Sequence, residues 1–388
     1  MRHFTVAERR ARLGVRHFLA AAATSPAEAA RGVLALHATD PASVFLSVRA
    51  RAANCDVAAV EDALYRERSL IRLLGMRRTM FVVPVDTAPV IQHACADAIA
   101  VTQRRRYLSL MGASGAGDAA FLKEVENSTA EALAARGEAT ASELAADEPR
   151  LRTKVRMNED KAYGGGQNIT TWVLLLLAAD GRIVRGRPKG GWNSSQWRWS
   201  PIETWLPAGM PALATEAARA ELARLWLAAF GPGTVADLRW WTGWTAAHTK
   251  QALAAVQPVE VDLGNGTTGL VLPDDLDPVP SPDPWIALLP ALDPTPMGWN
   301  GRGWYLGPHG TVLFDRNGNV GPTVWCDGRI VGGWAQRRSG VVVVRLLEDV
   351  GADASAAIDA EAERLGRWFG AVRPVPRFRT PLERELSS

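Results

Sequence analysis

A histidine, a threonine and an aspartate lie close together near the start of the chain, in the stretch His37-Ala38-Thr39-Asp40-Pro41. An imidazole can hold a water molecule by a hydrogen bond or act as a base near neutral pH. A threonine hydroxyl can help to position that water, and a carboxylate can stabilise positive charge that develops nearby. His37, Thr39 and Asp40 are therefore candidates for a site that holds water or stabilises developing charge.

Each of these residues also has a purely structural explanation. Proline disfavours the helical conformation in the residue before it, so a helix predicted over Pro26–Ala38 should stop by about Thr39. The next helix should start at Asp40-Pro41, with Asp40 as its N-cap and nothing more. His37 could simply bond a carbonyl at the end of the first helix. In the elbow between two helices, the side chains at positions 37 and 39 can both point into one cleft.

Helix-start signals recur along the chain at similar spacing. The signal at Asp40 is followed 100 residues later by the capping box Thr140-x-x-Glu143, and 94 residues after that by Thr234-x-x-Asp237. Around each start we predict an earlier helix, a later helix and a two-stranded hairpin, the order of a winged helix-turn-helix. The predicted segments are Pro26–Ala38, Val57–Arg66 and Leu70–Val83; Asp118–Ala135, Asn168–Ala179 and Ile183–Trp199; Leu213–Phe230, Trp244–Val256 and Val259–Leu272.

The last part of the chain differs in composition, because Pro, Gly, Trp and Val become dense from about Pro278 onward. Asp327-Gly328 lies between alternating apolar residues and predicts a two-residue hairpin. Gly340–Leu347 predicts a strand, and Asp353–Phe369 predicts an amphipathic helix with Asp353 as N-cap. We expect a β-rich subdomain packed against the third unit. The predicted domains are residues 1–112, 113–207, 208–277 and 278–388.

Composition excludes several classes of protein. The chain has 388 residues, 47% of them hydrophobic, which is ample for folded cores and argues against disorder. Three scattered cysteines and six scattered histidines form neither a disulfide framework nor a metal-ligand motif. The longest apolar run, Trp172–Ala179, is far too short for a membrane span, and the first residues make a poor signal peptide. We expect a cytoplasmic protein without metal or other cofactor and without membrane contact.

The net charge of +3 is unevenly distributed. Residues 1–110 have 16 Lys/Arg against 9 Asp/Glu, a net +7, whereas residues 201–388 have 16 against 21, a net −5. Runs of basic residues without acids suit phosphate contacts. A solvated charged face is the alternative interpretation. The predicted DNA-binding residues are Arg49, Arg51, Arg77, Arg78, Arg152, Lys154, Arg156, Arg185, Arg187 and Lys189.

Three stretches of the sequence resemble one known family. Gly32–Arg51, Leu288–Pro294 and Pro322–Trp334 are similar to the winged-helix DNA glycosylases of the AlkZ/YcaQ type, and the resemblance spans nearly the whole chain. It implies an α+β fold in which three tandem winged helix-turn-helix units form a C around DNA and a β-rich C-terminal subdomain follows. It also implies excision of bulky N7- or N3-alkylated purines or crosslinked bases from duplex DNA, in repair or in self-resistance to a genotoxin.

The chain departs from the family at the expected catalytic position. The family has Gln-apolar-Gln or Gln-apolar-Asp there, whereas the matching residues here are His37-Ala38-Thr39. Altered chemistry, another lesion and loss of activity all remain open. Because no lysine lies in the elbow, we predict a monofunctional glycosylase without lyase activity. We also expect the protein to be a monomer. The alternatives are a non-catalytic winged-helix regulator or damage sensor and, less favoured, a protein-binding scaffold.

Overall fold

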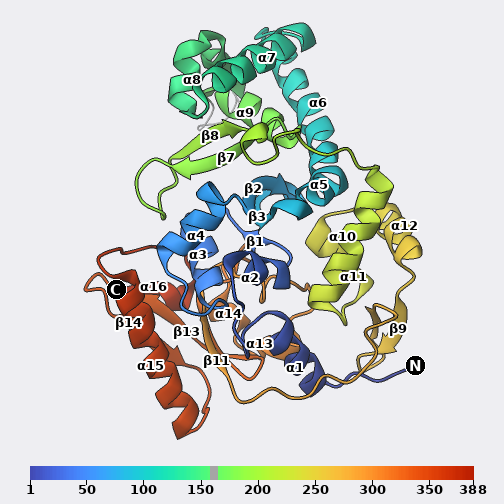
Figure 1. Ribbon diagram of the computed structural model, residues 1–388, viewed down its shortest axis with the longest axis vertical. Coiled ribbons are helices and arrows are strands. Elements are labelled where there is room, and N and C mark those ends of the chain that lie inside the picture. The colour runs from blue at the N-terminus through green and yellow to red at the C-terminus, as the bar shows by residue number, and fades with distance from the viewer. Residues whose placement is uncertain (158–164) are drawn as a thin grey trace.

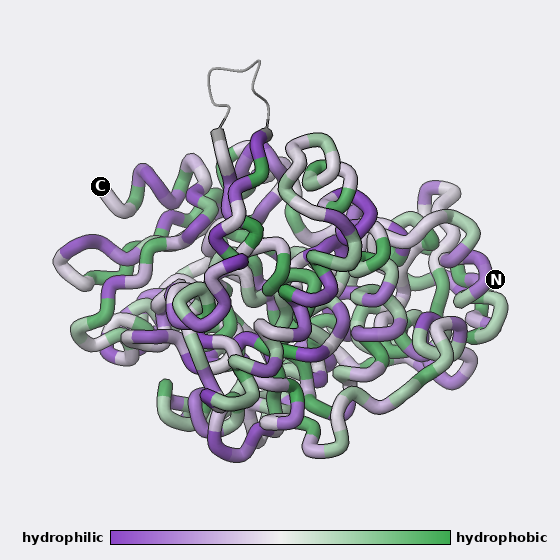
Figure 2. Tube along the Cα trace, turned by 90° about the horizontal axis from the view of Figure 1, so that it is seen from above, coloured by the Kyte–Doolittle hydropathy of each residue, from purple (hydrophilic) through white to green (hydrophobic). Residues whose placement is uncertain are grey.

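The computed structural model describes residues 1–157 and 165–388. Helices and strands alternate through most of the chain, so the fold is of the α+β kind (Figure 1). The two termini lie on opposite sides of the molecule in both views (Figures 1 and 2). A first helix, α1 (Val6–Arg16), precedes the repeated elements and is capped by the Thr5 hydroxyl, which accepts from the Glu8 amide.

The first repeated unit contains a three-stranded antiparallel sheet in the order β1-β3-β2. Its short first strand pairs with the last one, Leu36 opposite Val82 and His37 opposite Phe81. The elements are α2 (Pro26–Gly32), β1 (Leu36–His37), α3 (Pro41–Arg49), α4 (Val57–Glu61), η1 (Asp62–Arg66), β2 (Leu70–Gly75), η2 (Met76–Arg78) and β3 (Thr79–Pro84). The elements that connect it to the second unit are η3 (Val85–Thr87), α5 (Ala88–Ile91), η4 (Gln92–Ala96) and α6 (Asp97–Ala113).

The second unit repeats this order, again with its first short strand paired to its last strand, in the sheet β4-β8-β7. The predicted capping box at Thr140 and Glu143 is confirmed. The elements are α7 (Ala119–Arg136), β4 (Ala139–Thr140), α8 (Ala141–Asp147), η5 (Pro149–Arg152), β5 (Lys154–Met157), β6 (Gly165–Asn168), α9 (Thr170–Ala179), β7 (Ile183–Pro188), β8 (Trp197–Pro201) and η6 (Ile202–Thr204).

The third unit has the same order with its first strand reduced to one bridge, Gly233 opposite Leu270. The capping box at Thr234 and Asp237 is confirmed, and so is the third hairpin, which the sequence indicated least clearly. The elements are α10 (Thr215–Phe230), α11 (Val235–Thr242), α12 (Ala246–Val256), β9 (Val259–Asp262) and β10 (Thr268–Val271).

The C-terminal part is built on a four-stranded antiparallel sheet in the order β11-β12-β13-β14. Asp327 and Gly328 have positive φ angles of 47° and 81°, as the predicted two-residue hairpin requires. Gly351, and not Asp353, is the N-cap of the last long helix. The elements are β11 (Ile286–Leu289), α13 (Gly303–Leu306), α14 (Gly310–Leu313), β12 (Thr323–Cys326), β13 (Arg329–Gln336), β14 (Val342–Leu346), α15 (Ala352–Phe369) and α16 (Pro381–Ser387).

The C-terminal sheet packs against the first unit as well as the third. Leu288, Val324 and Trp334 share one buried apolar cluster with Phe45 of α3. Trp299 packs edge to face on Phe230 of α10, with ring centroids 5.2 Å apart. The expectation of contact with the third unit alone was therefore incomplete. Hydrophobic segments run through the middle of the molecule in Figure 2, in line with cores shared between units.

Candidate active site and nucleic-acid interface

The stretch that holds His37 is a strand and not the end of a helix, so the predicted helix over Pro26–Ala38 was too long. Helix α2 stops at Gly32, and Leu34 has a φ of 63°, which no right-handed helix accommodates. Strand pairing continues past β1, because the Ala38 amide donates to the Met80 carbonyl at 2.8 Å. His37 and Thr39 are both half-buried, whereas Ala38 between them and Asp40 after them are buried, which indicates that the side chains at positions 37 and 39 face the same way.

The His37 ring is half-buried against Phe81, with ring centroids 5.3 Å apart. Its Nδ1 is buried and has no hydrogen-bond partner among the described residues. Burial, together with the positive charge of Arg77, lowers the pKa of His37 to about 3. A neutral imidazole of such low basicity can orient a water molecule but takes a proton from it poorly. The geometry therefore favours orientation over general-base catalysis.

Asp40 is 6% exposed and holds two backbone amides. Its Oδ1 accepts from Ala42 in the first turn of α3 at 3.1 Å, so the structural alternative of an N-cap is confirmed. Its Oδ2 accepts from the amide of Arg377, near the C-terminal end, at 2.9 Å. Burial raises the pKa of Asp40, and the two amides and the Arg377 charge oppose that shift. Asp40 thus joins the candidate strand to a remote part of the chain.

Two of the predicted DNA-binding arginines are internal. The Arg51 side chain is 0% exposed and makes a two-fold ion pair with the equally buried Asp293, at 2.8 and 2.6 Å. Arg51 is not accessible to DNA, so its prediction as a DNA-binding residue is wrong. Arg49 is ion-paired with Glu361 of α15 and is only slightly exposed. Both lie on or next to α3 and attach it to the C-terminal part of the chain.

Three of the predicted DNA-binding residues lie together. Arg78, Arg185 and Lys189 line one hollow of about 590 Å³ between the β2–β3 hairpin and the second unit. Trp197 and Trp199 of β8 form part of the same wall. Cationic side chains interleaved with tryptophans suit contacts to phosphates and bases. The sequence predicted the three cationic residues of this wall. It did not show that the β2–β3 hairpin of the first unit forms the other side of the hollow.

The other predicted DNA-binding residues are spread over the surface. Arg187 is exposed, pairs with Glu61 at 3.2 Å and lies over the Tyr65 ring. Arg77 is exposed at the turn of the first hairpin and lies 4.4 Å from the ring centre of Trp240. The remaining three are exposed residues in or just before β5: Arg152, Lys154 and Arg156.

Two further arginines that the sequence did not single out lie beside these groups. Arg72 of β2 is 1% exposed, and its guanidinium carbon lies 4.1 Å from the ring centre of Trp197. The Arg377 Nη1 donates to the Thr39 carbonyl at 3.4 Å. A lone arginine in the apolar run Leu70–Leu74 was a visible signal for Arg72. Arg377 lies in a proline-rich tail and gave no signal.

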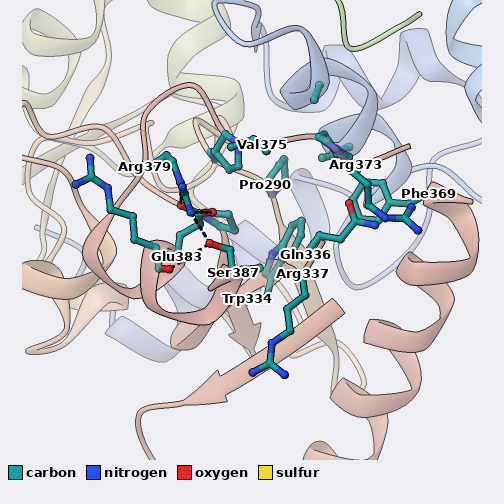
Figure 3. Close-up of a pocket in the computed structure, with 18 of the residues that line it drawn as sticks. Pro290, Trp334, Gln336, Arg337, Phe369, Arg373, Val375, Arg379, Glu383 and Ser387 are labelled. Atoms are coloured by element: carbon teal, nitrogen blue, oxygen red, sulfur yellow. Dashed lines mark hydrogen bonds and ion pairs between the residues drawn. The ribbon is translucent and has the colours of Figure 1, made fainter. Parts of the chain in front are cut away.

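A separate cavity of about 680 Å³, drawn in Figure 3, has Asp40 among its lining residues. Trp334 of β13 forms part of its floor, and Arg373 and Phe369 stand opposite Arg379 and Glu383. Neither His37 nor Thr39 lines it. The cavity therefore adjoins the candidate strand without including its two predicted water-holding groups.

Within residues 1–157 and 165–388, no cluster of three or more His, Cys, Asp or Glu side chains could hold a metal ion. The helices in the same residues are all too short or too polar to cross a membrane.

Comparisons with known proteins agree on one family. The sequence model of the AlkZ-like DNA glycosylases matches residues 30–368. Among solved structures, the DNA glycosylase AlkZ of Streptomyces sahachiroi superimposes with a TM-score of 0.74 at 21% sequence identity. That match covers 96% of this chain and 98% of the other. A comparison with curated proteins gave no match.

Proposed function

Because the chain belongs to the AlkZ-like DNA glycosylase family, we propose that it hydrolyses the N-glycosidic bond of bulky N7- or N3-alkylated purines, or of crosslinked bases, in duplex DNA. The observation that carries this proposal is the pair His37 in β1 and Thr39 just after it, both half-buried, at the positions that match the family's Gln-apolar-Gln signature. A role in self-resistance to a genotoxin belongs to the same proposal.

In the proposed reaction, His37 and Thr39 hold a water molecule against the sugar C1′. An N7- or N3-alkylated purine is already cationic and leaves readily, so the protein has mainly to support an oxocarbenium-like sugar and deliver water. The neutral His37 ring suits the holding of water through Nε2, since its Nδ1 is buried. Asp40 would supply negative charge near the sugar. Since the stretch from His37 to Pro41 has no lysine, lyase activity is not expected.

The repeated units supply the proposed DNA-binding frame. In each of them a helix, a short strand or bridge, two helices and a hairpin follow in the order of a winged helix. We propose that these three winged-helix units curve around one duplex as a monomer, with residues 1–112, 113–207 and 208–277 as units and 278–388 as the β-rich subdomain. An open site between units suits crosslinked bases, which cannot swing fully out of the helix.

The test is release of an N7-alkylguanine from duplex DNA under single-turnover conditions. We expect His37→Ala to slow release by about 100-fold or more, and Thr39→Ala by about tenfold, because each removes a water-holding group. The control is His248→Ala, a histidine on α12 outside the site. Equal release by wild type and His37→Ala would reject the assignment, and so would lack of release from every alkylated duplex tested.

One observation favours a second candidate, a non-catalytic DNA-binding protein. Both Asp40 oxygens are already engaged by backbone amides, and the family's glutamines are absent at positions 37 and 39. Such a regulator or sensor would protect one sequence in a footprint whether or not DNA is damaged. A repair enzyme binds with steep salt dependence and little sequence preference.

A further inference from the structure

The hollow between the first two units has a lining without negative charge. It measures about 590 Å³ and lies where the β7–β8 hairpin passes next to β2 (Figure 1). Among the described residues that line it, Arg78, Arg185 and Lys189 are cationic, and none is an aspartate or a glutamate. A cavity of this size is typical of sites for small organic molecules. The charge of the lining favours an anion.

Apolar side chains form much of the remaining wall. They come from the first hairpin, from α9 and from β8: Leu74, Met80, Leu174, Leu175, Trp197 and Trp199. Contact with such a wall removes the apolar surface of a ligand from water, which is favourable. The hollow therefore suits an anion with a flat, apolar body better than a bare inorganic ion.

The hollow lies on the side of the first sheet that faces away from His37. Leu74 pairs with Met80, and both line the hollow, whereas Phe81 pairs with His37. Neighbouring residues on a strand point to opposite faces of the sheet. An occupant of the hollow is therefore separate from the base that would lie against His37.

Arg185 is a largely buried cation in this wall. Its guanidinium carbon lies 5.3 Å from the ring centre of Trp199 and 5.8 Å from that of Trp197, and its Nε is buried without a hydrogen-bond partner in the described chain. Burial, together with the positive charge of Arg72, lowers the pKa of Arg185 to about 10, so the group is still charged at neutral pH. Because a buried cation with free N–H groups is costly, an anionic ligand that pairs with it is strongly favoured.

Arg72 adds a second unpaired charge behind the wall. It is 1% exposed, and its Nε and Nη2 are buried without hydrogen-bond partners. Its only polar contact in the described chain is Nη1 donating to the Tyr65 hydroxyl at 3.2 Å. Its guanidinium carbon lies 4.1 Å from the ring centre of Trp197, the same ring that Arg185 approaches. Arg72 does not line the hollow, but its charge adds to the positive potential there.

We propose that this hollow binds a nucleoside phosphate, with the base against the wall of Trp197, Trp199 and Leu174 and the phosphate paired with Arg185 and Lys189. The choice of this class of anion rests on the proposed function, because nucleotides are the aromatic anions that a protein acting on DNA meets. A planar guanidinium matches two phosphate oxygens, and indole rings are common contacts for bases. The nucleotide is either free in solution or part of an unpaired stretch of a DNA strand.

The test is equilibrium dialysis of the full chain against deoxyguanosine monophosphate, deoxyguanosine and inorganic phosphate. We expect the monophosphate to bind about tenfold or more tightly than either of its parts, because the apolar wall and the cations both contribute. Inorganic phosphate that binds as tightly as the nucleotide would overturn the proposal, since the base would then make no contact. Deoxyguanosine that binds as tightly would overturn it as well, since the cations would then contribute nothing.

Substitutions of the two cations test the proposed phosphate contact. Arg185→Gln and Lys189→Gln should each weaken binding of the monophosphate by about tenfold, because each removes a charge-assisted hydrogen bond. Lys189 is exposed, so its variant answers the question even where Arg185→Gln does not fold. The control is Lys250→Gln, an exposed lysine on α12 outside the hollow, which should bind as the wild type does. Unchanged binding in both test variants, or equal weakening in the control, would contradict the assignment.

Competition with DNA distinguishes the two sources of the nucleotide. Displacement of the monophosphate by a single-stranded oligonucleotide, and not by a blunt duplex at the same concentration, identifies unpaired DNA as the source. No displacement by either DNA identifies the free nucleotide. Displacement by the duplex would overturn the proposal, because backbone phosphates alone would then occupy the site.

Duplex binding by the variants provides a further check. Its affinity is measured by fluorescence anisotropy at several salt concentrations. A slope of log K against log salt that falls by about 1 in each glutamine variant, with unchanged binding of the monophosphate, would show backbone contacts in place of a nucleotide site.

The outcomes separate this inference from the function on which its ligand class rests. Base release from an alkylated duplex by a protein that does not bind the monophosphate would overturn the nucleotide site alone. Binding of the monophosphate without release of any alkylated base would leave the nucleotide site in place and reject the proposed hydrolysis.

Discussion

Two histidines, His17 and His37, have strongly lowered pKa values and should make the folded protein sensitive to acid. His17 is completely buried, and its Nδ1 and Nε2 lie 2.9 Å from the Thr295 hydroxyl and 3.1 Å from the Ala229 carbonyl. Burial lowers the pKa of His17 to about 3, as it does for His37. Both rings are therefore neutral in the folded protein at pH values where they would be charged in the unfolded chain.

The free energy of unfolding should fall as the solution is acidified. Below pH ~6.5 the unfolded chain takes up protons that the folded protein refuses until pH ~3, so the free energy of unfolding falls as the pH drops between these values. We expect a loss on the order of 1 kcal/mol per histidine for each pH unit in this window. Urea unfolding from pH 7 to pH 4 measures it. A His17→Asn variant should be less stable at pH 7 but lose less on acidification.

The low pKa of His37 also makes a prediction for catalysis. Because the ring stays neutral down to pH ~3, the rate of base release should show no limb near pH 6.5 that depends on His37. Single-turnover rates from pH 5 to pH 8, compared between wild type and His37→Gln, provide the measurement. A limb present in the wild type and absent in the variant would show that His37 works as a titrating base.

At the scale of elements, the short strand β1 and helix α3 together orient the candidate site. Pairing with β3 fixes the direction of the His37 side chain. The N-cap Asp40 lies two residues after the last paired amide, that of Ala38, and fixes the start of α3 at Pro41. Asp40 therefore has two structural roles. One carboxylate oxygen caps α3, and the other accepts a hydrogen bond from the Arg377 amide. These structural roles need hydrogen-bond acceptors, whereas the proposed catalytic role needs the negative charge, so substitutions can separate the two.

Substitutions at Asp40 separate these duties. Asp40→Ala removes a cap and a link to the tail and should lower the free energy of unfolding by about 1–3 kcal/mol. Asp40→Asn should cost less because an amide oxygen still caps the helix. If the negative charge supports the sugar, Asp40→Asn will slow base release far more than it weakens folding. Asp56→Asn, the N-cap of α4, is the matched control for both measurements.

Some elements were predictable from the sequence, and others depend on distant partners. The capping boxes at Thr140 and Thr234 and the hairpin at Asp327-Gly328 are local, so a few neighbouring residues specify them. The strand β1 has two residues and exists only because β3 pairs with it more than forty residues later. Local helical preference therefore gave the wrong structure for His37. The Arg51–Asp293 pair spans 242 positions, and no spacing rule could have placed Arg51 in the interior.

At the scale of the whole molecule, buried polar contacts hold the first unit on the C-terminal sheet. Arg51 and Asp293 are fully buried, and Arg51 also donates to the Ser47 carbonyl and the Thr295 hydroxyl. Ser43 and Ser47 of α3 donate to the Ala291 carbonyl and to Asp293. Helix α3 is thereby fixed to residues 291–295, which lie more than 240 positions later in the chain.

Removal of one partner of the buried Arg51–Asp293 pair should strongly destabilise the protein. Arg51→Ala leaves the Asp293 charge buried and unpaired, so we expect a loss of about 3–5 kcal/mol in the free energy of unfolding. The salt slope of DNA binding should not change in the folded variant, because Arg51 reaches no phosphate. Denaturant unfolding and anisotropy titrations at a temperature where the variant is folded provide the two measurements. A reduced salt slope of DNA binding would show that Arg51 does contact a phosphate.

The contact between Asp40 and the Arg377 amide also has a meaning for synthesis of the protein. The two residues are 337 positions apart, so the ribosome adds Arg377 long after Asp40 has left the exit tunnel. While the first unit is being made it lacks both this contact and the Asp293 partner of Arg51, and the charge beside Thr39 arrives only with the segment around Arg377. The candidate site is therefore assembled only after the segment around Arg377 has been made.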